Sequence, residues 1–182
     1  DDAASKSGNN ETLSLASSVF HAGIAKHLTS GDEKIKQIQD RLIAKLTSKT
    51  TSSVQNCIAK ALPPLIKANP EDGPELVERL MKMAFKEKEE VQRRGAAMGM
   101  GAVIKGLSVS SLKSLNIMDQ LKEAAEDKQA NTRQGSLMCF EGLSMALGRL
   151  FEPHVIATLP VLLGAMSDTN VAVRTAAYNS AK

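Results

Sequence analysis

Apolar residues recur every three or four positions over almost the whole chain after residue 10, which is the period of an amphipathic helix. The first such stretch lies between Leu13 and Leu28 and follows Asn10, a residue type that favours helix N-caps. No stretch alternates apolar and polar residues for long enough to predict a strand. The pattern therefore predicts an all-α protein, with residues 1–10 as a flexible polar lead-in.

Clusters of turn-forming residues divide this helical pattern into segments. We expect breaks near residues 30, 48, 71, 87, 108, 128, 149 and 168, and therefore roughly eight or nine helices after residue 10. Pro63 and Pro64 fall inside one segment. Because proline lacks the backbone donor of a helix and disfavours helical geometry in the preceding residue, here Leu62, we also expect a sharp kink or a break at this point.

The helical segments repeat with a period of about 40 residues. Three arginines, 40 and 41 residues apart, each have an acidic residue six positions before them and a small residue three positions after them. The acid–arginine pairs are Glu87 and Arg93, Asp127 and Arg133, and Asp168 and Arg174. In a weaker fourth copy, Asn56 stands 37 residues before the first of these arginines, with Thr50 in the acidic position. Such a repeat indicates one structural unit used several times.

Each arginine would lie near the start of the second helix of a two-helix unit, with the acid in the preceding turn. Stacked two-helix units of about 40 residues are the HEAT design. We therefore expect residues 11–182 to form one HEAT-repeat α-solenoid, in which the six charged residues pair along one edge as a structural ladder. We also expect a segment of a longer array, because both ends fall within helical patterns, and self-association of the isolated segment through its exposed end faces.

Composition narrows the picture further. Hydrophobic residues make up 42% of the chain but aromatic residues only 3%, with no Trp, so the core must consist of aliphatic side chains. The net charge of +3 indicates a mixed surface rather than a nucleic-acid-binding one. Cys57 and Cys139 have no metal or redox spacing and are typical of buried thiols in a cytosolic or nuclear protein. Met98, Met138 and Met145 fall on expected second helices, where core packing is favoured over an adaptable binding face.

The sequence carries no pattern that is typical of a catalytic or metal site. Gly95 and Gly99 superficially resemble part of a phosphate-binding loop, but they lie four residues apart inside a helical pattern, which favours close helix–helix contact. His21 and His27 are six positions apart and point to different sides of a helix, and His154 is isolated. We therefore expect no enzyme activity, cofactor, metal or small-molecule substrate. No apolar run approaches the roughly 18 residues of a membrane span, so we expect no membrane contact.

Three stretches carry a family resemblance. They read RRGAAMGMGAVIKGL at 93–107, LGRLFEPHVIATLPVLL at 147–163 and SDTNVAVRTAA at 167–177. With the residues between them, they resemble the central HEAT region of the general-control translational activator family, which is itself similar to the N-terminal HEAT domain of fungal elongation factor three. The resemblance covers roughly 54–182, and His154 and Met98 depart from it by standing where tyrosine is expected.

The resemblance implies a non-catalytic scaffold that works in the cytoplasm. This family stimulates the kinase that phosphorylates the alpha subunit of translation initiation factor two during amino-acid starvation, with its kinase-binding surface closer to the C-terminus than this segment. The expected partners are the ribosome, through its RNA or a ribosomal protein, and regulatory proteins. Arg94, Lys105 and Arg149 have no assigned acidic partner in the sequence pattern and are the candidates for this contact.

Two other functions are open for a HEAT array. An ATPase like elongation factor three also contains a HEAT domain, but its catalysis needs a GxxxxGK[ST] loop, which this sequence lacks. A generic protein-binding scaffold such as a transport receptor would need an acidic inner face for basic cargo, which the net charge of +3 disfavours.

Overall fold

The computed structural model describes residues 33–182, and this part of the chain is helical without any strand. The α-helices are α2 (Glu33–Leu46), α3 (Ser52–Ala68), α4 (Gly73–Lys86), α5 (Glu90–Leu107), α6 (Ser111–Ser114), α7 (Ile117–Ala125), α8 (Ala130–Leu147), α9 (Glu152–Ala165) and α10 (Val171–Ser180). A 3-10 helix, η1 (Gly148–Phe151), precedes α9. The all-α fold class is confirmed. The expected lead-in at 1–10 and the helix expected between Leu13 and Leu28 lie outside the described residues.

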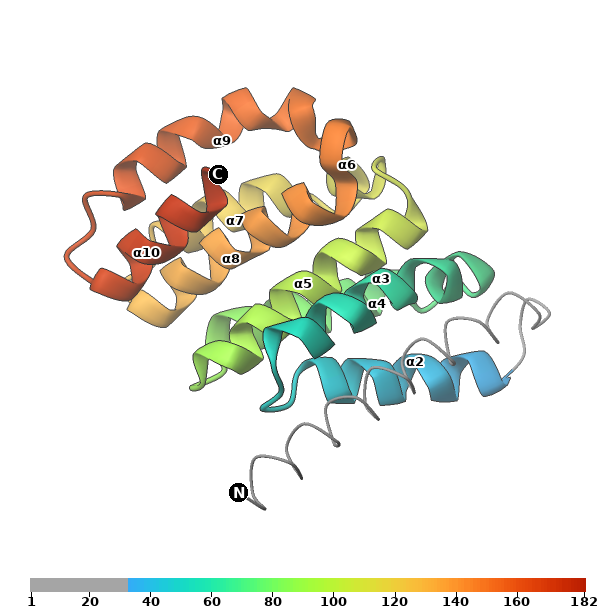
Figure 1. Cartoon of the computed structure of the whole chain (residues 1–182). Coiled ribbons are helices and arrows are strands. Elements are labelled where there is room, and N and C mark those ends of the chain that lie inside the picture. Colours follow the sequence, from blue (N-terminus) through green and yellow to red (C-terminus); the bar gives the residue numbers. More distant parts are fainter. Residues whose placement is uncertain (1–32) are drawn as a thin grey trace, which may run out of the picture.

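The helices form stacked antiparallel pairs. In each pair a first helix packs on a second one: α2 on α3, α4 on α5, α7 on α8, and α9 on α10. The second helices lie side by side in one layer, in the order α3, α5, α8 and α10 (Figure 1). The first helix α4 also contacts α8 of the following pair. This is the stacking of a HEAT-type α-solenoid, and its turns fall where breaks were expected from residue 48 onward.

The core lies at the junctions between these helices and is largely aliphatic, as the low aromatic content predicts. Leu62, Leu80, Ile104 and Leu121 are each fully buried. Burying one such side chain stabilises the fold by about 1.5–3 kcal/mol. Because every unit contributes to the junction with its neighbour, the array holds together through contacts between adjacent units rather than through one central core.

Helix α3 differs from the expectation for Pro63 and Pro64. It is one continuous helix from Ser52 to Ala68, through both Pro63 and Pro64, so the break, one of the two outcomes expected there, is wrong. A proline inside a helix costs about 3 kcal/mol or more. Leu62, Leu65 and Ile66 surround the prolines and are all 0% exposed, and burial of three such side chains, about 4.5–9 kcal/mol, is comparable to the cost of two prolines, about 6 kcal/mol. Packing against the neighbouring helices therefore keeps the segment helical despite its local sequence.

One described stretch, 130–165, is apolar and long enough to cross a membrane by length and composition alone. In the structure it comprises several elements, because η1 separates α8 from α9. Helix α8 contributes Leu137, Cys139 and Leu143 to the core, each at 0% exposure. Burial within the array therefore accounts for the apolar character of the first part of this stretch.

Candidate functional site

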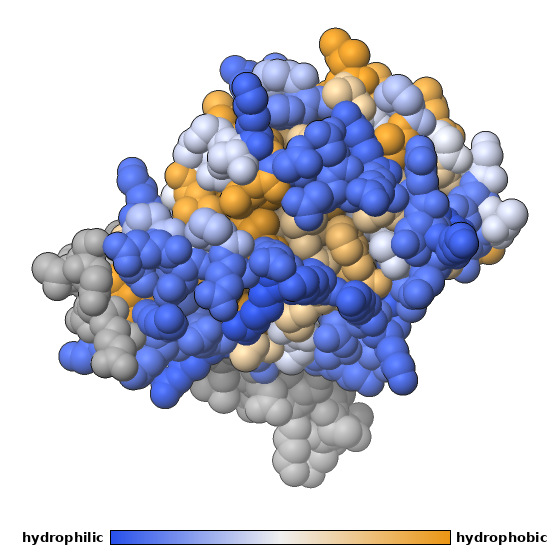
Figure 2. All heavy atoms as spheres, turned by 180° about the vertical axis from the view of Figure 1, so that it is seen from behind, coloured by the Kyte–Doolittle hydropathy of each residue, from blue (hydrophilic) through white to orange (hydrophobic). Residues whose placement is uncertain are grey.

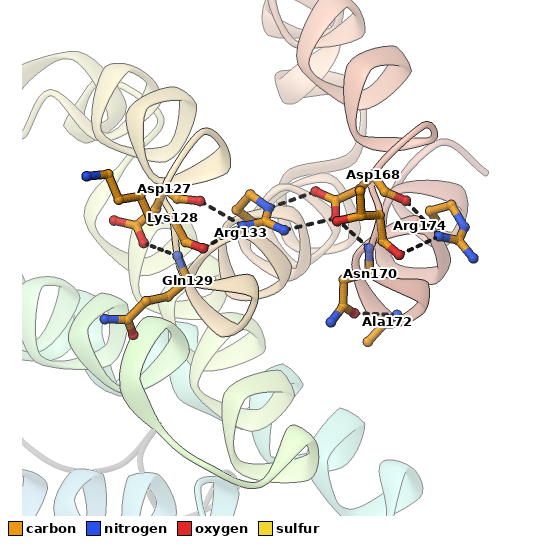
Figure 3. A network of polar contacts seen from close by, with 9 residues as sticks. Asp127, Lys128, Gln129, Arg133, Asp168, Asn170, Ala172 and Arg174 are labelled. Atoms are coloured by element: carbon orange, nitrogen blue, oxygen red, sulfur yellow. Dashed lines mark hydrogen bonds and ion pairs between the residues drawn. The ribbon is translucent and has the colours of Figure 1, made fainter.

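A polar side chain at the fourth position of each second helix bonds the backbone before its own helix. In three helices this residue is arginine, and its Nη1 donates to two backbone oxygens of the turn (Figure 3 shows the last two). The bonds run from Arg93 to Glu87 O and Lys88 O (both 2.8 Å), from Arg133 to Asp127 O (2.8 Å) and Lys128 O (3.0 Å), and from Arg174 to Asp168 O (2.7 Å) and Thr169 O (3.1 Å). Each arginine thereby fixes the turn between the two helices of its unit.

Arg133 also joins its unit to the next one. Its Nε and Nη2 donate to the two carboxylate oxygens of Asp168 at 2.7 and 2.9 Å (Figure 3). The side chains are only 16% and 13% exposed. The hydrogen bond from Arg133 lowers the pKa of Asp168 below its ordinary value, and the same bond raises the pKa of Arg133. A bidentate pair of this kind has one favoured geometry, so it sets the register of the two units.

At the preceding junction, between the α4–α5 unit and the α7–α8 unit, the arginine bonds an amide side chain. Arg93 Nη2 donates to Gln134 Oε1 in the next unit, while the Asp127 carboxylate accepts the backbone N–H of Gln129 at 2.7 Å. Burial lowers the pKa of Arg93, and its Nε has no hydrogen-bond partner among the described residues. Glu87 enters the arrangement through its backbone oxygen. The two junctions therefore carry an arginine–amide bond and an arginine–carboxylate pair.

The first copy of the repeat needs a correction. The fourth residue of α3 is Gln55, not Asn56. Gln55 is 1% exposed, and its Nε2 donates to the backbone oxygen of Leu46, the last residue of α2, at 3.2 Å and to Val91 O in the next unit at 2.8 Å. Counting from the N-cap Thr51 would have found it, since the arginines occupy the same helical position. We call Gln55, Arg93 and Arg133, which each also bond the next unit, the inter-unit ladder; Arg174 holds the same helical position and bonds its own turn.

A groove runs along the second helices. It consists of a larger hollow of about 560 Å³ and a smaller one of about 320 Å³. The two hollows share four lining residues, Asn56, Met98, Gly142 and Met145, so we treat them as one feature, the second-helix groove. Helices α3, α5 and α8 line both hollows, and α10 adds to the larger one.

The structure brings two of the three candidate contact residues to this groove. Arg94 lines the larger hollow and Lys105 the smaller one. Arg149 is exposed on η1 and lines neither. Arg94 has an acidic partner after all, because its Nη2 lies 3.2 Å from Glu90 Oε1. Lys105 and Arg149 form no ion pair among residues 33–182.

The predicted methionine and glycine positions have different surroundings in the structure. Met138 is buried at 5% exposure, but Met145 is 60% exposed over the groove and Met98 is partly buried. A Cβ at Gly95 would lie 2.0 Å from the backbone oxygen of Leu46. The glycine therefore allows close approach of two segments, which accounts for it without a phosphate-binding role.

Helix α9 exposes an apolar face. Val155, Ile156, Leu159 and Leu163 are 39, 80, 43 and 62% exposed. Their spacing places them along one side of the helix. Figure 2 shows hydrophobic atoms protruding at the upper edge of the molecule, where Figure 1 places α9. This face lies apart from the groove, none of whose lining residues belongs to α9.

The histidines contribute no ligand set in the described part of the chain. His154 lies beside Phe151, with ring centroids 5.7 Å apart. Residues 33–182 contain no group of three or more His, Cys, Asp or Glu side chains placed to hold a metal ion. His21 and His27 lie outside the described residues.

Stacked helix pairs joined by a repeated polar residue define a HEAT-repeat array, and residues 93–182 match the family model of the EF3 N-terminal HEAT repeat. The stalled ribosome sensor GCN1 of Homo sapiens is 41% identical over 165 residues, which is 90% of this chain and 6% of that protein. The chain therefore belongs to the GCN1 family, the family that its sequence resembles.

Other members extend this similarity to plants and fungi. Protein ILITYHIA of Arabidopsis thaliana is 39% identical over 165 residues, again 90% of this chain and 6% of the relative. The eIF-2-alpha kinase activator GCN1 of Saccharomyces cerevisiae is 32% identical over 166 residues, with the same shares. The chain thus spans only about 6% of the length of these relatives. No solved structure matches the chain.

Proposed function

We propose that the chain is a non-catalytic scaffold segment of a translational activator that works in the cytoplasm. The whole protein associates with ribosomes and stimulates the kinase of initiation factor two alpha in amino-acid starvation. The observation that carries this proposal is the 41% identity over 90% of the chain to a protein named a stalled ribosome sensor. A fungal relative named as an eIF-2-alpha kinase activator supports the same pathway.

The mechanism in this proposal is geometric. Residues 11–182 act as one array, and the inter-unit ladder sets the angle between successive units. That angle determines the shape of the second-helix groove, because the groove is lined by helices from several units. A partner then recognises the shape together with the charges placed on it. The role of Glu87, Asp127 and Asp168 is structural, through the turn and junction contacts of Arg93, Arg133 and Arg174.

Three basic residues are the proposed partner contacts. Arg94 and Lys105 reach the groove, and Arg149 extends the basic surface beyond it on η1. The ion pair of Arg94 with Glu90 does not remove this role, because their side chains are 37% and 49% exposed and exposed pairs of this kind are weak. An acidic protein or ribosomal RNA phosphate could displace it.

The test is a triple charge reversal in the full-length protein, Arg94→Glu, Lys105→Glu and Arg149→Glu. Ribosome co-sedimentation should fall several-fold at low salt, and the difference should shrink at high salt because exposed charges are screened. Helicity by circular dichroism should stay unchanged.

The matched control reverses three exposed lysines outside the groove, Lys67→Glu, Lys86→Glu and Lys113→Glu. It should leave co-sedimentation at the wild-type level. Equal binding of both triple variants would contradict the proposed contact, and the segment would then act as a rigid spacer between binding regions elsewhere in the protein.

A further inference from the structure

The smaller hollow of the second-helix groove has an unusual combination of linings. Its surface consists of small or apolar residues, with Met98 and Met145 among them, and one amide, Asn56. Lys60 and Lys105 are the only charged residues that line it. Its volume of about 320 Å³ lies within the range of about 300–1,000 Å³ that ligand-binding pockets usually have.

The hollow exists because α5 and α8 pack unusually closely. A Cβ at Gly101 would lie 2.3 Å from the backbone oxygen of Gly142. Small residues flank this contact on the groove side, namely Ala102 on α5 and Ala146 on α8. Because no large side chain lies over the contact between α5 and α8, the smaller hollow stays open. Met145 borders it and is 60% exposed.

The exposed side chain of Met145 indicates a surface that a bound partner would stabilise by removing it from water. Methionine is flexible and polarisable, so it adapts to partners of different shape. Met145 lies on α8, which buries every residue from Gln134 to Phe140 but exposes Ser144 and Met145 near its C-terminal end. Covering Met145 and the partly buried Met98 would remove apolar surface from water, which favours an occupant with an apolar face.

The two lysines define the charge of that occupant. Lys60 lies on α3 and Lys105 on α5, both exposed, and neither forms an ion pair among residues 33–182. Both ammonium groups are therefore available to carboxylates that flank an apolar face. The lining has no aromatic side chain on which a nucleobase could stack, and it has no arginine for bidentate phosphate contact. These features favour a protein segment over RNA.

We infer that the smaller hollow binds an amphipathic helix of a partner protein, with apolar residues over Met98 and Met145 and acidic residues beside Lys60 and Lys105. This is the helix-in-groove mode of recognition, in which apolar anchors recur at every third or fourth position. The inference rests on the proposed scaffold function and names the kind of partner that this part of the groove takes.

The test measures the affinity of designed helical peptides for the full-length protein by fluorescence anisotropy. Two 18-residue peptides share one leucine face and differ only in its flanks, which are glutamate in one and lysine in the other. The glutamate peptide should bind about tenfold tighter, because exposed attractive pairs become repulsive in the lysine peptide. Lys60→Glu with Lys105→Glu should reverse the order, whereas Lys67→Glu with Lys86→Glu should leave it unchanged.

A second variant tests the hollow itself. Ala146→Phe places a large side chain in the space and should weaken the glutamate peptide several-fold, with helicity by circular dichroism unchanged. The inference is overturned if the two peptides bind equally, if Lys60→Glu with Lys105→Glu has no effect, or if a single-stranded RNA displaces the glutamate peptide more strongly from the wild-type protein than from that variant. Because no ribosome is present, this assay can fail while ribosome association stands, and the reverse also holds.

Discussion

Asp168→Asn removes the charge from the arginine–carboxylate pair between the last two units while keeping the size of the side chain. The asparagine oxygen can still accept the backbone N–H of Asn170, which the Asp168 Oδ1 accepts at 2.8 Å. What is lost is the bidentate ionic contact with Arg133, at 2.7 and 2.9 Å. The substitution therefore isolates the junction contact from the turn contact.

The expected loss follows from burial and from what Arg133 retains. The paired side chains are 16% and 13% exposed, so solvent screens the contact only in part. Hydrogen bonds to charged groups contribute about 1.5–3 kcal/mol. Arg133 keeps its bonds to Asp127 O and Lys128 O, and the asparagine oxygen keeps one acceptor. We therefore expect Asp168→Asn to lower the free energy of unfolding of the last unit by about 1–2 kcal/mol.

The chain offers a local probe for this measurement. Its single tyrosine, Tyr178, lies on α10, and it has no tryptophan. Tyrosine fluorescence therefore reports the last unit, while circular dichroism reports the whole array. In urea, Asp168→Asn should shift the fluorescence midpoint more than the dichroism midpoint, because the last unit is coupled to the rest through this junction.

The pH dependence has a definite sign. The folded pKa of Asp168 is lowered from 3.8 by the bond from Arg133, so its stabilising contribution is present above the unfolded pKa and is lost as the pH falls through the folded one. Wild type and Asp168→Asn should thus differ at pH 7, and the difference should shrink as the pH falls below 3.8, the unfolded value, through the lower folded pKa.

The matched control is Asp127→Asn. The Asp127 carboxylate accepts only a backbone N–H in its own turn, so its neutralisation should cost less than about 0.5 kcal/mol. If the two variants lose equal stability, or if the effect of Asp168→Asn does not shrink as the pH falls below 3.8, the ladder does not couple the units in the way proposed.

Three further predictions follow from packing. In urea titrations, Gly142→Ala should lower the free energy of unfolding by about 1–3 kcal/mol, because its Cβ would lie 2.5 Å from the backbone oxygen of Ala97. Gly164→Ala should raise the free energy of unfolding by about 0.5 kcal/mol, because no atom lies within 4 Å of its Cβ. Cys139 is fully buried with its pKa raised by burial, so a thiol reagent should label it only after unfolding, and labelling in the native protein would contradict this packing. The isolated chain should self-associate through the apolar face of α9, and Ile156→Asp should shift its sedimentation equilibrium several-fold toward monomer, with unchanged association counting against this face.

Features that repeat along the chain could be predicted from the sequence. The all-α class and the turns follow from the helical period of apolar residues, which depends only on near neighbours. The position of Arg93, Arg133 and Arg174 in their helices follows from a repeat that recurs with the same offsets. In both cases the same local interactions act in each unit, so one copy predicts the next.

Features that depend on packing between units could not be predicted. Pro63 and Pro64 remain in a helix because surrounding side chains are buried by other helices, which local propensity does not encode. Gln55 takes the ladder position with a different donor, and a search for the acid–arginine pattern passes over it. Lys60 on α3 and Lys105 on α5 line the same hollow, and this arrangement follows from how the units stack.

The most direct test of the account measures phosphorylation of the alpha subunit of initiation factor two in amino-acid-starved cells. The cells express the full-length protein with Arg94, Lys105 and Arg149 changed to glutamate, or with the control changes at Lys67, Lys86 and Lys113, at equal protein levels. If these residues form a working contact of the scaffold, phosphorylation falls several-fold only with the first variant. Wild-type phosphorylation with both variants would contradict the proposed contact.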